Sequence, residues 1–208
     1  MNTAILNYIN YNKEMEFKPH HTAIGGTCSN TAKLLLGEVD IKDFILDYGC
    51  GLGRNMQYLA DNTGKQIHGT DIIEQLDKEK NRHDQLRKAG HTIELSHLLS
   101  DNYYDKVLCS HVLNVVDNDN VKQSILNDIC AKLKRGGKLY LEVRTEKDIT
   151  KATSKEKYND GWKIKKGKYF TYQEGITKEK MCNLIQQAGL TIEKHIFNSS
   201  KHIVVASK

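Results

Sequence analysis

Apolar residues along this chain fall into short continuous runs, separated by longer segments in which apolar positions recur every three or four residues. The first clear run, Phe44–Leu46, ends at Asp47 and passes into Gly49, Gly51 and Gly53. Short apolar runs bounded by turn residues are typical of buried strands, and recurrence at helical spacing is typical of amphipathic helices. The pattern therefore predicts an α/β fold in which strands and helices alternate along the chain.

Repeated along the first two thirds of the sequence, this pattern predicts five strands. The expected strands cover 44–48, 66–72, 91–95, 104–111 and 138–143. Helices are expected over 28–36, from 54 onward, over 73–89 and over 121–133, the last ended by Gly136-Gly137.

The last third of the chain differs from the rest. No regular period is visible from Thr145 to Gly175; a helix follows over Thr177–Ala188, with Gly189 as its stop. Two further strands are expected over 191–197 and 202–207. Only four residues join them, too few for a parallel crossover, so the last strand has to run antiparallel to the one before it.

Length and cysteine usage narrow the class of protein. A chain of 208 residues suits one domain over 1–208 with a substantial core. Its five cysteines are odd in number and widely spread, with no CxxC pair, which favours free thiols in a reducing compartment. The sequence has no apolar run of membrane-spanning length and no basic segment followed by an apolar one at its start. We therefore expect a cytoplasmic protein.

The formal net charge is +5, and it is concentrated in one segment. Between Arg144 and Lys180 the chain has eleven Lys or Arg residues against six Asp or Glu, so the whole excess lies there. Five aromatic residues are interleaved with these lysines: Tyr158, Trp162, Tyr169, Phe170 and Tyr172.

The glycine-rich turn is the first candidate for chemistry. Glycines at alternate positions permit positive φ and remove the side chains that would keep a ligand from the backbone. A dinucleotide fingerprint GxGxxG that starts at Gly49 would need glycine at position 54, where this chain has Arg54. The spacing therefore disfavours NAD.

An acid two residues before the glycines, in Asp47-Tyr48-Gly49-Cys50-Gly51-Leu52-Gly53, resembles the DxGxGxG motif of class I S-adenosylmethionine (SAM) methyltransferases. A second short strand, closing on Asp71-Ile72, matches the family's next motif, whose acid holds the two ribose hydroxyls. The resemblance implies a single-domain, Rossmann-like three-layer sandwich with a seven-stranded mixed sheet and an antiparallel C-terminal hairpin. It also implies SAM as cofactor, bound by Asp47, Gly49, Cys50, Gly51, Gly53, Asp71 and Ile72.

Two later motifs add candidates for the same site. The family commonly places a residue near Asp101 against the adenine amino group, although a turn-forming Asp explains this position equally well. Ser110 and His111 end the fourth strand, where the family's residues face the transferable methyl. His111 is the candidate general base for an acceptor that arrives protonated. The alternative is a strand-end histidine that only packs over the cofactor or bonds to backbone.

The nearby acidic and cysteine side chains point to no further chemistry. Asp117 and Asp119 lack a third metal ligand and are better explained as helix caps, and no metal is expected. Cys50 has no adjacent base and is expected to fill space.

The acceptor is a separate question. DNA base methylation on exocyclic nitrogens usually goes with a (D/N/S)PP(Y/F/W) motif at the end of strand four, and cytosine C5 methylation with a Pro-Cys nucleophile. This chain has Ser110-His111-Val112-Leu113-Asn114 there and a single proline, Pro19. It is similar here to small-molecule class I enzymes. Through HHTAIGG, LDYGCGLGR and HVLNVV it also loosely resembles, over about half the chain, a group of methyltransferases associated with DNA phosphorothioation systems.

Two segments are expected to cover the site. Residues 1–40 form an N-terminal arm and covering helix, in which His20 or His21 either lines the pocket or is merely solvated. The basic and aromatic segment 145–176 is expected to be a lid or acceptor-recognition insert. Its lysines and aromatics would also suit an unpaired nucleic-acid base and its phosphates, so a nucleic-acid-modifying methyltransferase stays the first alternative to a small or medium-sized acceptor. A SAM-binding protein without transfer activity is the second.

Overall fold

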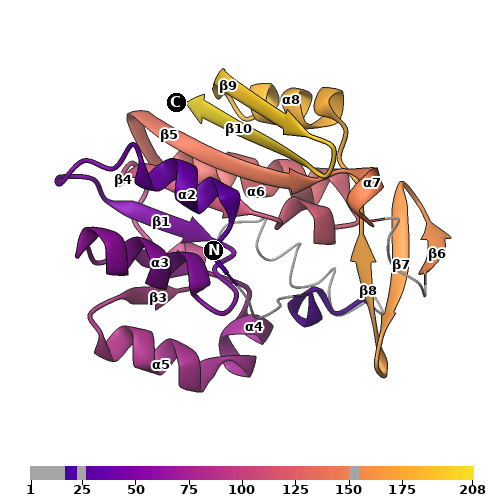
Figure 1. Cartoon of the computed structure of the whole chain (residues 1–208), viewed down its shortest axis with the longest axis horizontal. Helices are drawn as coiled ribbons and strands as arrows, with labels where there is room; N and C mark the ends of the chain where they lie inside the picture. Colours follow the sequence, from indigo (N-terminus) through magenta and orange to yellow (C-terminus); the bar gives the residue numbers. More distant parts are fainter. Residues whose placement is uncertain (1–16, 23–26, 150–154) are drawn as a thin grey trace.

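A computed structural model describes residues 17–22, 27–149 and 155–208 of the chain. Its main feature is a seven-stranded sheet with the strand order β3-β2-β1-β4-β5-β10-β9 (Figure 1). The strands are β1 (Ile45–Tyr48), β2 (His68–Thr70), β3 (Thr92–Glu94), β4 (Tyr104–Ser110), β5 (Leu133–Arg144), β9 (Thr191–Asn198) and β10 (Lys201–Ser207).

The directions of the strands confirm the predicted fold class. β1 pairs in parallel with β2 and β4, β2 with β3, and β4 with β5. β10 pairs antiparallel with both β5 and β9, as the four-residue connection required. Because β1 and β4 lie side by side at the centre and the chain leaves in opposite directions from them, their carboxyl ends open a crevice at the switch in strand order.

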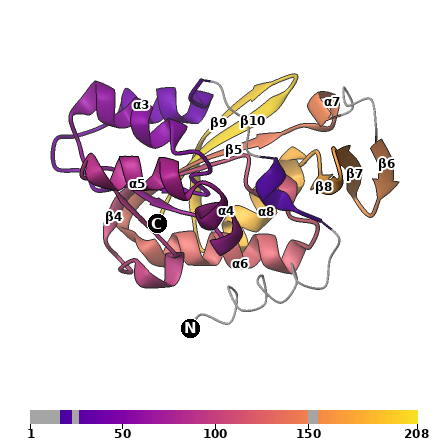
Figure 2. The ribbon, with the colours of Figure 1, turned by 90° about the horizontal axis from the view of Figure 1, so that it is seen from below.

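Helices cover both faces of the sheet, and alternate strand residues supply the core on each face. α2 (Asn30–Leu36), α3 (Arg54–Thr63) and α5 (Lys80–Lys88) pack against residues such as Ile45 and Leu108. α6 (Asp119–Lys132) and α8 (Lys178–Gln187) pack against Leu46 and Val107 on the other face. Figure 2 shows α3 and α6 on opposite sides of the sheet. Each buried side chain of this size contributes about 1.5–3 kcal/mol, which explains why the apolar periods predicted these elements well.

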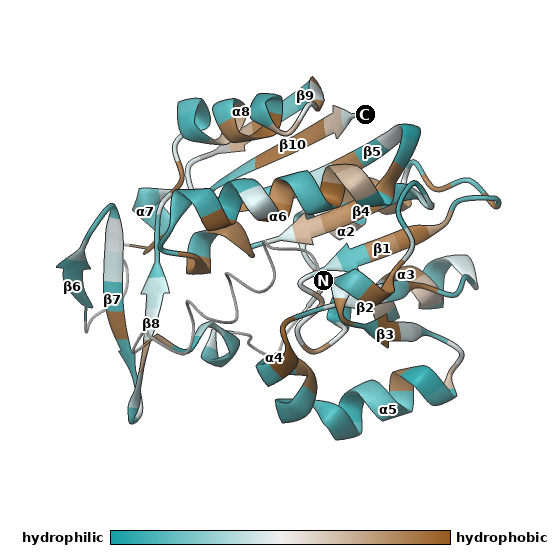
Figure 3. Ribbon diagram, turned by 180° about the vertical axis from the view of Figure 1, so that it is seen from behind, coloured by the Kyte–Doolittle hydropathy of each residue, from teal (hydrophilic) through white to brown (hydrophobic). Residues whose placement is uncertain are grey.

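The helix beginnings follow from local sequence. Ser29, Asn118 and Thr177 are the N-caps of α2, α6 and α8, and each accepts hydrogen bonds from backbone N–H groups of the first turn. The hydropathy of the elements agrees with a buried sheet covered by helices. In Figure 3 the hydrophobic colour lies on β4 and β10, and most of α5 is hydrophilic. None of the described helices is long and apolar enough to cross a membrane.

The segment that showed no period is a second sheet. β6 (Lys155–Tyr158), β7 (Gly161–Lys166) and β8 (Tyr169–Gln173) form an antiparallel three-stranded sheet, preceded by the short helix α7 (Glu146–Ile149). Sequence reasoning missed these strands because lysines occupy both faces and hide the alternation. The lysine ammonium groups lie over aromatic rings instead, as Lys157 does 4.8 Å from the centre of Trp162 and Lys163 does 4.1 Å from that of Phe170.

One buried side chain ties both ends of this second sheet to the core. Asn114, in the short helix η3 (Leu113–Val115), donates its amide to the carbonyls of Arg144, at 3.1 Å, and Glu174, at 2.6 Å. Its side-chain oxygen accepts from the Arg144 N–H at 2.9 Å. The chain therefore leaves β5 and returns after β8 at the same point. The role of Asn114 within HVLNVV is structural.

Several boundaries differ from the sequence prediction. The helix expected over 73–89 is two helices, α4 (Ile73–Lys78) and α5, with the break at Glu79. β5 begins at Leu133, so Gly136-Gly137 lie inside the strand rather than ending a helix; Gly136 has a φ of +77° there. β3 is shorter than expected and is followed by the 3-10 helix η2 (Ser96–Leu98).

Candidate functional site

A cavity of about 500 Å³ lies at the carboxyl ends of β1, β2 and β4. Its lining comes from segments far apart in sequence, including the glycine turn, the residues after β2, the end of β4, and the short helix η1 (Pro19–His21). Figure 1 shows η1 between α4 and β8. The volume is within the usual range for a small-molecule site, roughly 300–1,000 Å³.

The glycine turn forms one wall of this cavity. Gly49, Gly51 and Gly53 have φ angles of +78°, +54° and +70°, in the left-handed region that favours glycine. A Cβ atom on Gly49 would lie 2.2 Å from a methyl carbon of Val112, and one on Gly53 would lie 2.3 Å from a methyl carbon of Leu86. The alternating glycines are therefore required by backbone conformation and by packing. Gly49, Cys50 and Gly51 line the cavity, and Gly53 supports the turn from behind.

Two side chains hold the turn in place. Asp71, directly after β2, accepts hydrogen bonds from the backbone N–H of Gly51 at 2.7 Å and of Ile72 at 2.8 Å. His83 of α5, fully buried, contacts the Gly51 carbonyl through Nε2 at 2.7 Å. Burial raises the pKa of Asp71 to about 6, although the two N–H groups lower it. Asp71 and Ile72 line the cavity as expected; His83 gave no signal in the sequence beyond its place in a helix.

Asp47 is completely buried at the tip of β1, beneath the turn. Neither carboxylate oxygen has a well-formed hydrogen bond among the described residues. Burial raises the pKa of this carboxyl to about 7, and the nearby Asn55 side chain offsets it only in part. Cys50, also buried, has its thiol pKa raised well above the usual value by burial, which agrees with a space-filling role.

A second wall holds a polar network that the sequence did not indicate. The buried carboxylate of Asp128, on α6, accepts hydrogen bonds from the Tyr48 hydroxyl, at 2.7 Å, and from the Ser96 hydroxyl. All three residues line the cavity. Asp101, expected here, lies elsewhere: it is exposed and pairs with Lys132 at 2.7 Å. The expectation that Asp101 reaches the pocket is wrong because β3 ends at Glu94, so the chain turns into the cavity at Leu95-Ser96 instead.

Ser110 and His111 are where the sequence placed them, at the end of β4 and on the cavity wall. The Ser110 hydroxyl and His111 Nδ1 are buried and have no hydrogen-bond partner among the described residues. His111 has a φ of +63°, uncommon for a residue with a side chain. Its backbone N–H donates to the Glu142 carbonyl at 2.8 Å.

Further lining residues come from β5, α7, β8 and η1. Arg144 donates through Nε to Asp148 at 2.6 Å and through Nη1 to Gln173 at 2.9 Å, and all three residues face the cavity. His20 lines the cavity too, whereas His21 stacks on Tyr169 with ring centres 4.1 Å apart. None of the five aromatic residues of the basic segment is part of the lining. The part of this segment that reaches the cavity is therefore polar, with Asp148 and Gln173.

The residues present fit the predicted cofactor. The turn offers backbone without side chains, and Asp71 retains free lone pairs next to it, since a carboxylate can accept about four hydrogen bonds. The Ser110 hydroxyl on the cavity wall has no partner among the described residues; such buried polar atoms are rare in proteins and call for a ligand or water to satisfy them. No group of three or more His, Cys, Asp or Glu residues suited to a metal ion occurs within the described ranges.

Comparison with known families gives one match. Residues 46–141, a little under half of the chain, match the family described as a methyltransferase domain. This segment includes the glycine turn, Asp71 and the end of β4. No match was found among curated proteins.

Solved structures share the fold at low sequence identity. A SAM-dependent methyltransferase from Methanosarcina mazei is 17% identical, with a TM-score of 0.66, and the alignment covers 88% of this chain and 99% of that one. The 1,6-didemethyltoxoflavin-N1-methyltransferase of Burkholderia thailandensis is 17% identical, with a TM-score of 0.62 and coverage of 98% and 84%. The geranyl diphosphate C-methyltransferase of Streptomyces coelicolor is 12% identical, with a TM-score of 0.59 and coverage of 85% and 77%.

These comparisons bear on the predictions at different levels. The solved structures confirm the predicted fold. The family match confirms the predicted class of enzyme, a methyltransferase, and with it the predicted cofactor. Neither comparison identifies the acceptor of this chain.

Proposed function

We propose, on the premise that residues 46–141 are a methyltransferase domain, that this protein transfers the methyl group of SAM to a small acceptor bound in the same cavity. The observation that carries the proposal is the glycine turn, whose backbone lies open on the cavity and is fixed by Asp71 and His83. We further propose that the chain works as one unit, with residues 145–176 contributing to acceptor recognition through Asp148 and Gln173.

Four of the predicted residues that line the cavity then have roles in holding the cofactor. Gly49, Cys50 and Gly51 present backbone to it, and Asp71 accepts the hydrogen bonds of the ribose hydroxyls. Leu95, Ser96 and Asp128 form the wall that takes the adenine, in place of Asp101. When bound, the cofactor supplies a methyl group already activated by its sulfonium. The protein's main task is then to hold the acceptor in line and keep water out, which is worth roughly 7–11 kcal/mol of the barrier.

The size of the cavity supports a small acceptor. About 500 Å³ has to take both the cofactor and the group that is methylated. The structures from B. thailandensis and S. coelicolor are named for small acceptors, 1,6-didemethyltoxoflavin and geranyl diphosphate. We propose that His111, on the wall next to Ser110, takes the acceptor's proton where one has to be removed.

The aromatic side chains of the basic segment do not favour the nucleic-acid alternative. A base-stacking platform needs exposed rings. Here Tyr172 is buried, Tyr169 stacks on His21, and Lys155 and Lys157 lie over Trp162. The loose similarity to methyltransferases of DNA phosphorothioation systems stays a prediction. A cytoplasmic location also stays a proposal, in agreement with five free cysteines.

Calorimetry with SAM and with its demethylated product tests the proposal directly. We expect the wild-type chain to bind both, and Asp71→Asn to weaken binding at least tenfold, because one acceptor oxygen becomes an amide donor. Asp77→Asn, an exposed change on the neighbouring helix α4, is the matched control and should bind as the wild type does. Absence of binding heat for the wild-type protein would refute the proposal.

Methyl-labelled SAM in a host lysate, fractionated into metabolites, proteins and nucleic acids, then identifies the acceptor class. We expect label in the metabolite fraction. Label in nucleic acid, with binding to short single strands that weakens steeply with salt, would favour the alternative enzyme. Tight cofactor binding with no labelled product in any fraction would indicate a SAM-binding protein without transfer activity.

A further inference from the structure

Two cationic side chains lie opposite each other in the part of the cavity that β5 and β10 form. Arg144 ends β5 and Lys201 begins β10, and they are Cα partners in the antiparallel pairing of these strands. Directly opposed residues of such a pair project to the same face, with Cβ atoms about 4.5–5.5 Å apart. Both residues line the cavity. Because like charges in this position repel each other, the pair favours an anion nearby.

The protein's own acceptors use only part of the Arg144 guanidinium. Its Nε donates to the Asp148 carboxylate at 2.6 Å, Nη1 donates to Gln173 Oε1 at 2.9 Å, and Nη2 lies 3.5 Å from the Asp148 carbonyl. A guanidinium has five N–H donors, and each of these contacts uses one of them. The remaining N–H groups have no partner among the described residues.

Gln173 and Lys201 add further donors to the same region. A guanidinium can only donate, so the Gln173 oxygen has to face Arg144, and the Gln173 NH2 group is left without a partner within the described ranges. Lys201 Nζ lies 2.7 Å from a carboxylate oxygen of Glu142, which offsets its charge, but an ammonium has three N–H donors. The unused polar groups of these three residues are therefore hydrogen-bond donors.

The main chain holds Arg144 in place before any ligand binds. The Arg144 N–H donates to the Asn114 side chain at 2.9 Å, and its carbonyl accepts from Asn114 at 3.1 Å and from the Ile176 N–H at 3.0 Å. Asp148 and Gln173 then fix the guanidinium itself. A site ordered in advance loses little conformational freedom on binding, which favours affinity.

We propose that the acceptor carries an anionic oxygen group, a carboxylate or a phosphate, which binds to Arg144, Lys201 and Gln173. A guanidinium matches two oxygens of such a group, and this geometry makes arginine a common partner of both. Asp148 is the one acidic residue in contact with the Arg144 side chain, and because Arg144 already pairs with it, Asp148 is less suited to bind a cationic acceptor.

This inference rests on the proposed function and gives the acceptor an orientation. In the sheet, β4 lies between β1, which leads into the glycine turn, and β5 with β10, which carry Arg144 and Lys201. The anionic group is then held on the far side of β4 from the glycine turn, and the atom that receives the methyl lies between them, near Ser110. The methylated atom is separate from the anionic group, so the product keeps its negative charge.

The charge of the methylated product tests the inference first. The wild-type protein is incubated with methyl-labelled SAM and the metabolite fraction of the host, and the labelled product is passed over an anion exchanger at neutral pH. We expect the exchanger to retain it. Loss of retention after alkaline phosphatase treatment would identify a phosphate, and unchanged retention a carboxylate. A labelled product that passes the exchanger without binding would overturn the inference.

Gln173→Glu tests the same site by reversing one contact. The new carboxylate can still accept from Arg144, but it replaces a donor by a negative charge. With the metabolite fraction as acceptor and SAM saturating, the apparent KM of the acceptor should rise at least about tenfold, because like charges in contact oppose binding. Gln187→Glu, the same change at an exposed position on α8, should leave this KM unchanged. Affinity for the demethylated cofactor should stay within about threefold in both variants. An unchanged KM in Gln173→Glu contradicts the inference.

Asp148→Asn separates an anionic acceptor from a cationic one. Asparagine keeps an oxygen that can accept from Arg144 Nε and removes a competing negative charge, so the KM of an anionic acceptor should stay the same or fall. A rise in KM here, together with a fall in Gln173→Glu, would indicate a cationic acceptor and overturn the inference. If the wild type binds no SAM or labels no metabolite, the proposed function is wrong. If a labelled metabolite forms but is not anionic, only the inference about the acceptor's charge is wrong.

Discussion

At the scale of single residues, Asp47 has the most unusual environment in the described structure. Burial raises the pKa of its carboxyl to about 7, whereas an unfolded chain releases this proton near pH 4. Between about pH 4 and 7 the folded state therefore holds a proton that the unfolded state has lost. The free energy of unfolding must fall as the pH rises through this window. Asp71, raised to about 6, acts in the same direction over a narrower range.

Asp47→Asn should remove most of this pH dependence in the cofactor-free protein. Urea unfolding at about pH 4 or below should give the variant and the wild type similar stability, because Asp47 is then largely protonated in the unfolded state as well as in the folded state. At pH 8 the variant should be more stable, by an amount on the order of a few kcal/mol, since each unit of pKa shift is worth about 1.4 kcal/mol. Equal differences at both pH values would contradict this assignment, and Asp77→Asn, an exposed change on α4, is the control.

At the scale of elements, the glycine turn depends on close contact with the start of η3. Gly49→Ala would strain a φ of +78° and push a methyl group against Val112. Gly64→Ala strains a similar φ of +67°, but nothing lies within 4 Å of its Cβ position. Both variants should lose about 1–2 kcal/mol of stability through the strained backbone, and only Gly49→Ala adds a steric clash.

Gly49→Ala should therefore lose stability by about 1–3 kcal/mol more than Gly64→Ala, the usual cost of overpacking. It should also lose measurable binding of SAM, which Gly64→Ala should retain. Thermal unfolding and calorimetry check the two effects. Normal cofactor binding by Gly49→Ala would show that the turn is not the docking surface.

The elements also show what sequence reasoning can and cannot reach. The apolar runs of β1, β4 and β10, the caps at Ser29 and Thr177, and the acid-tipped glycine turn are local signals, and they predicted the fold and most of the cofactor wall. The small sheet was missed because lysines on both of its faces hide the alternation of apolar and polar residues. The contacts of Tyr48, Ser96 and Asp128 were missed because these residues are distant in sequence, and no local pattern shows that they meet.

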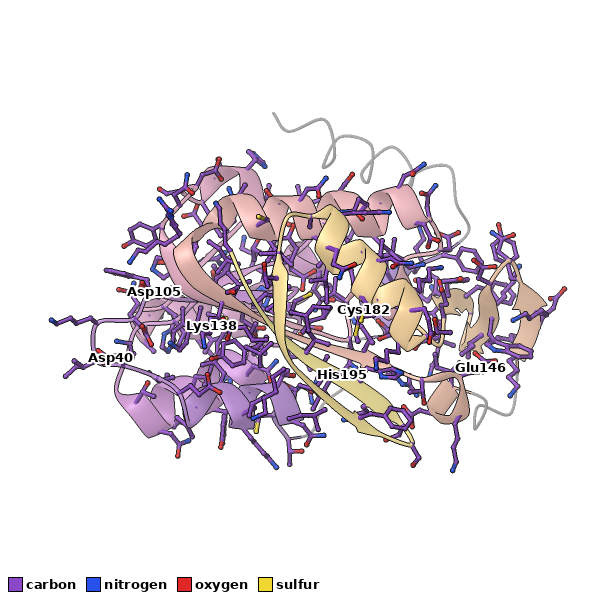
Figure 4. All side chains as sticks on the ribbon, turned by 90° about the horizontal axis from the view of Figure 1, so that it is seen from above. Asp40, Asp105, Lys138, Glu146, Cys182 and His195 are labelled. Atoms are coloured by element: carbon purple, nitrogen blue, oxygen red, sulfur yellow. The ribbon has the colours of Figure 1, made fainter. Side chains whose placement is uncertain are left out.

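At the scale of the whole molecule, one buried ion pair links the small sheet to the helices of the large one. Lys122 of α6 is fully buried and pairs with Glu174, the residue after β8. Glu174 also meets Nζ of Lys180, on α8, at 2.6 Å, and the Tyr172 hydroxyl at 3.0 Å. On the other side, Trp162 of β7 donates to Glu146 of α7 at 2.7 Å; Figure 4 shows Glu146 beside the small sheet.

Lys122→Met should destabilise the protein by about 3–5 kcal/mol, because it leaves part of a buried carboxylate unpaired. Adding Glu174→Gln should recover some of that loss, since the uncompensated charge is gone. Lys134→Met is the matched control: its partner Asp105 is partly exposed, so the loss should stay below about 1 kcal/mol. Urea unfolding of the four proteins decides, and a Lys122→Met loss as small as that of the control would contradict the linking role.

The hydrogen bonds of the Asn114 amide bear on which segment of this fold can vary in sequence. Asn114 donates hydrogen bonds to the carbonyls of both Arg144 and Glu174, so the stretch between them leaves and rejoins the large sheet at one point. A different sequence could replace the segment between those two positions without changing the glycine turn and the other residues proposed to hold the adenosyl group. If that stretch recognises the acceptor, as proposed above, acceptor recognition can change without altering the residues of the glycine turn.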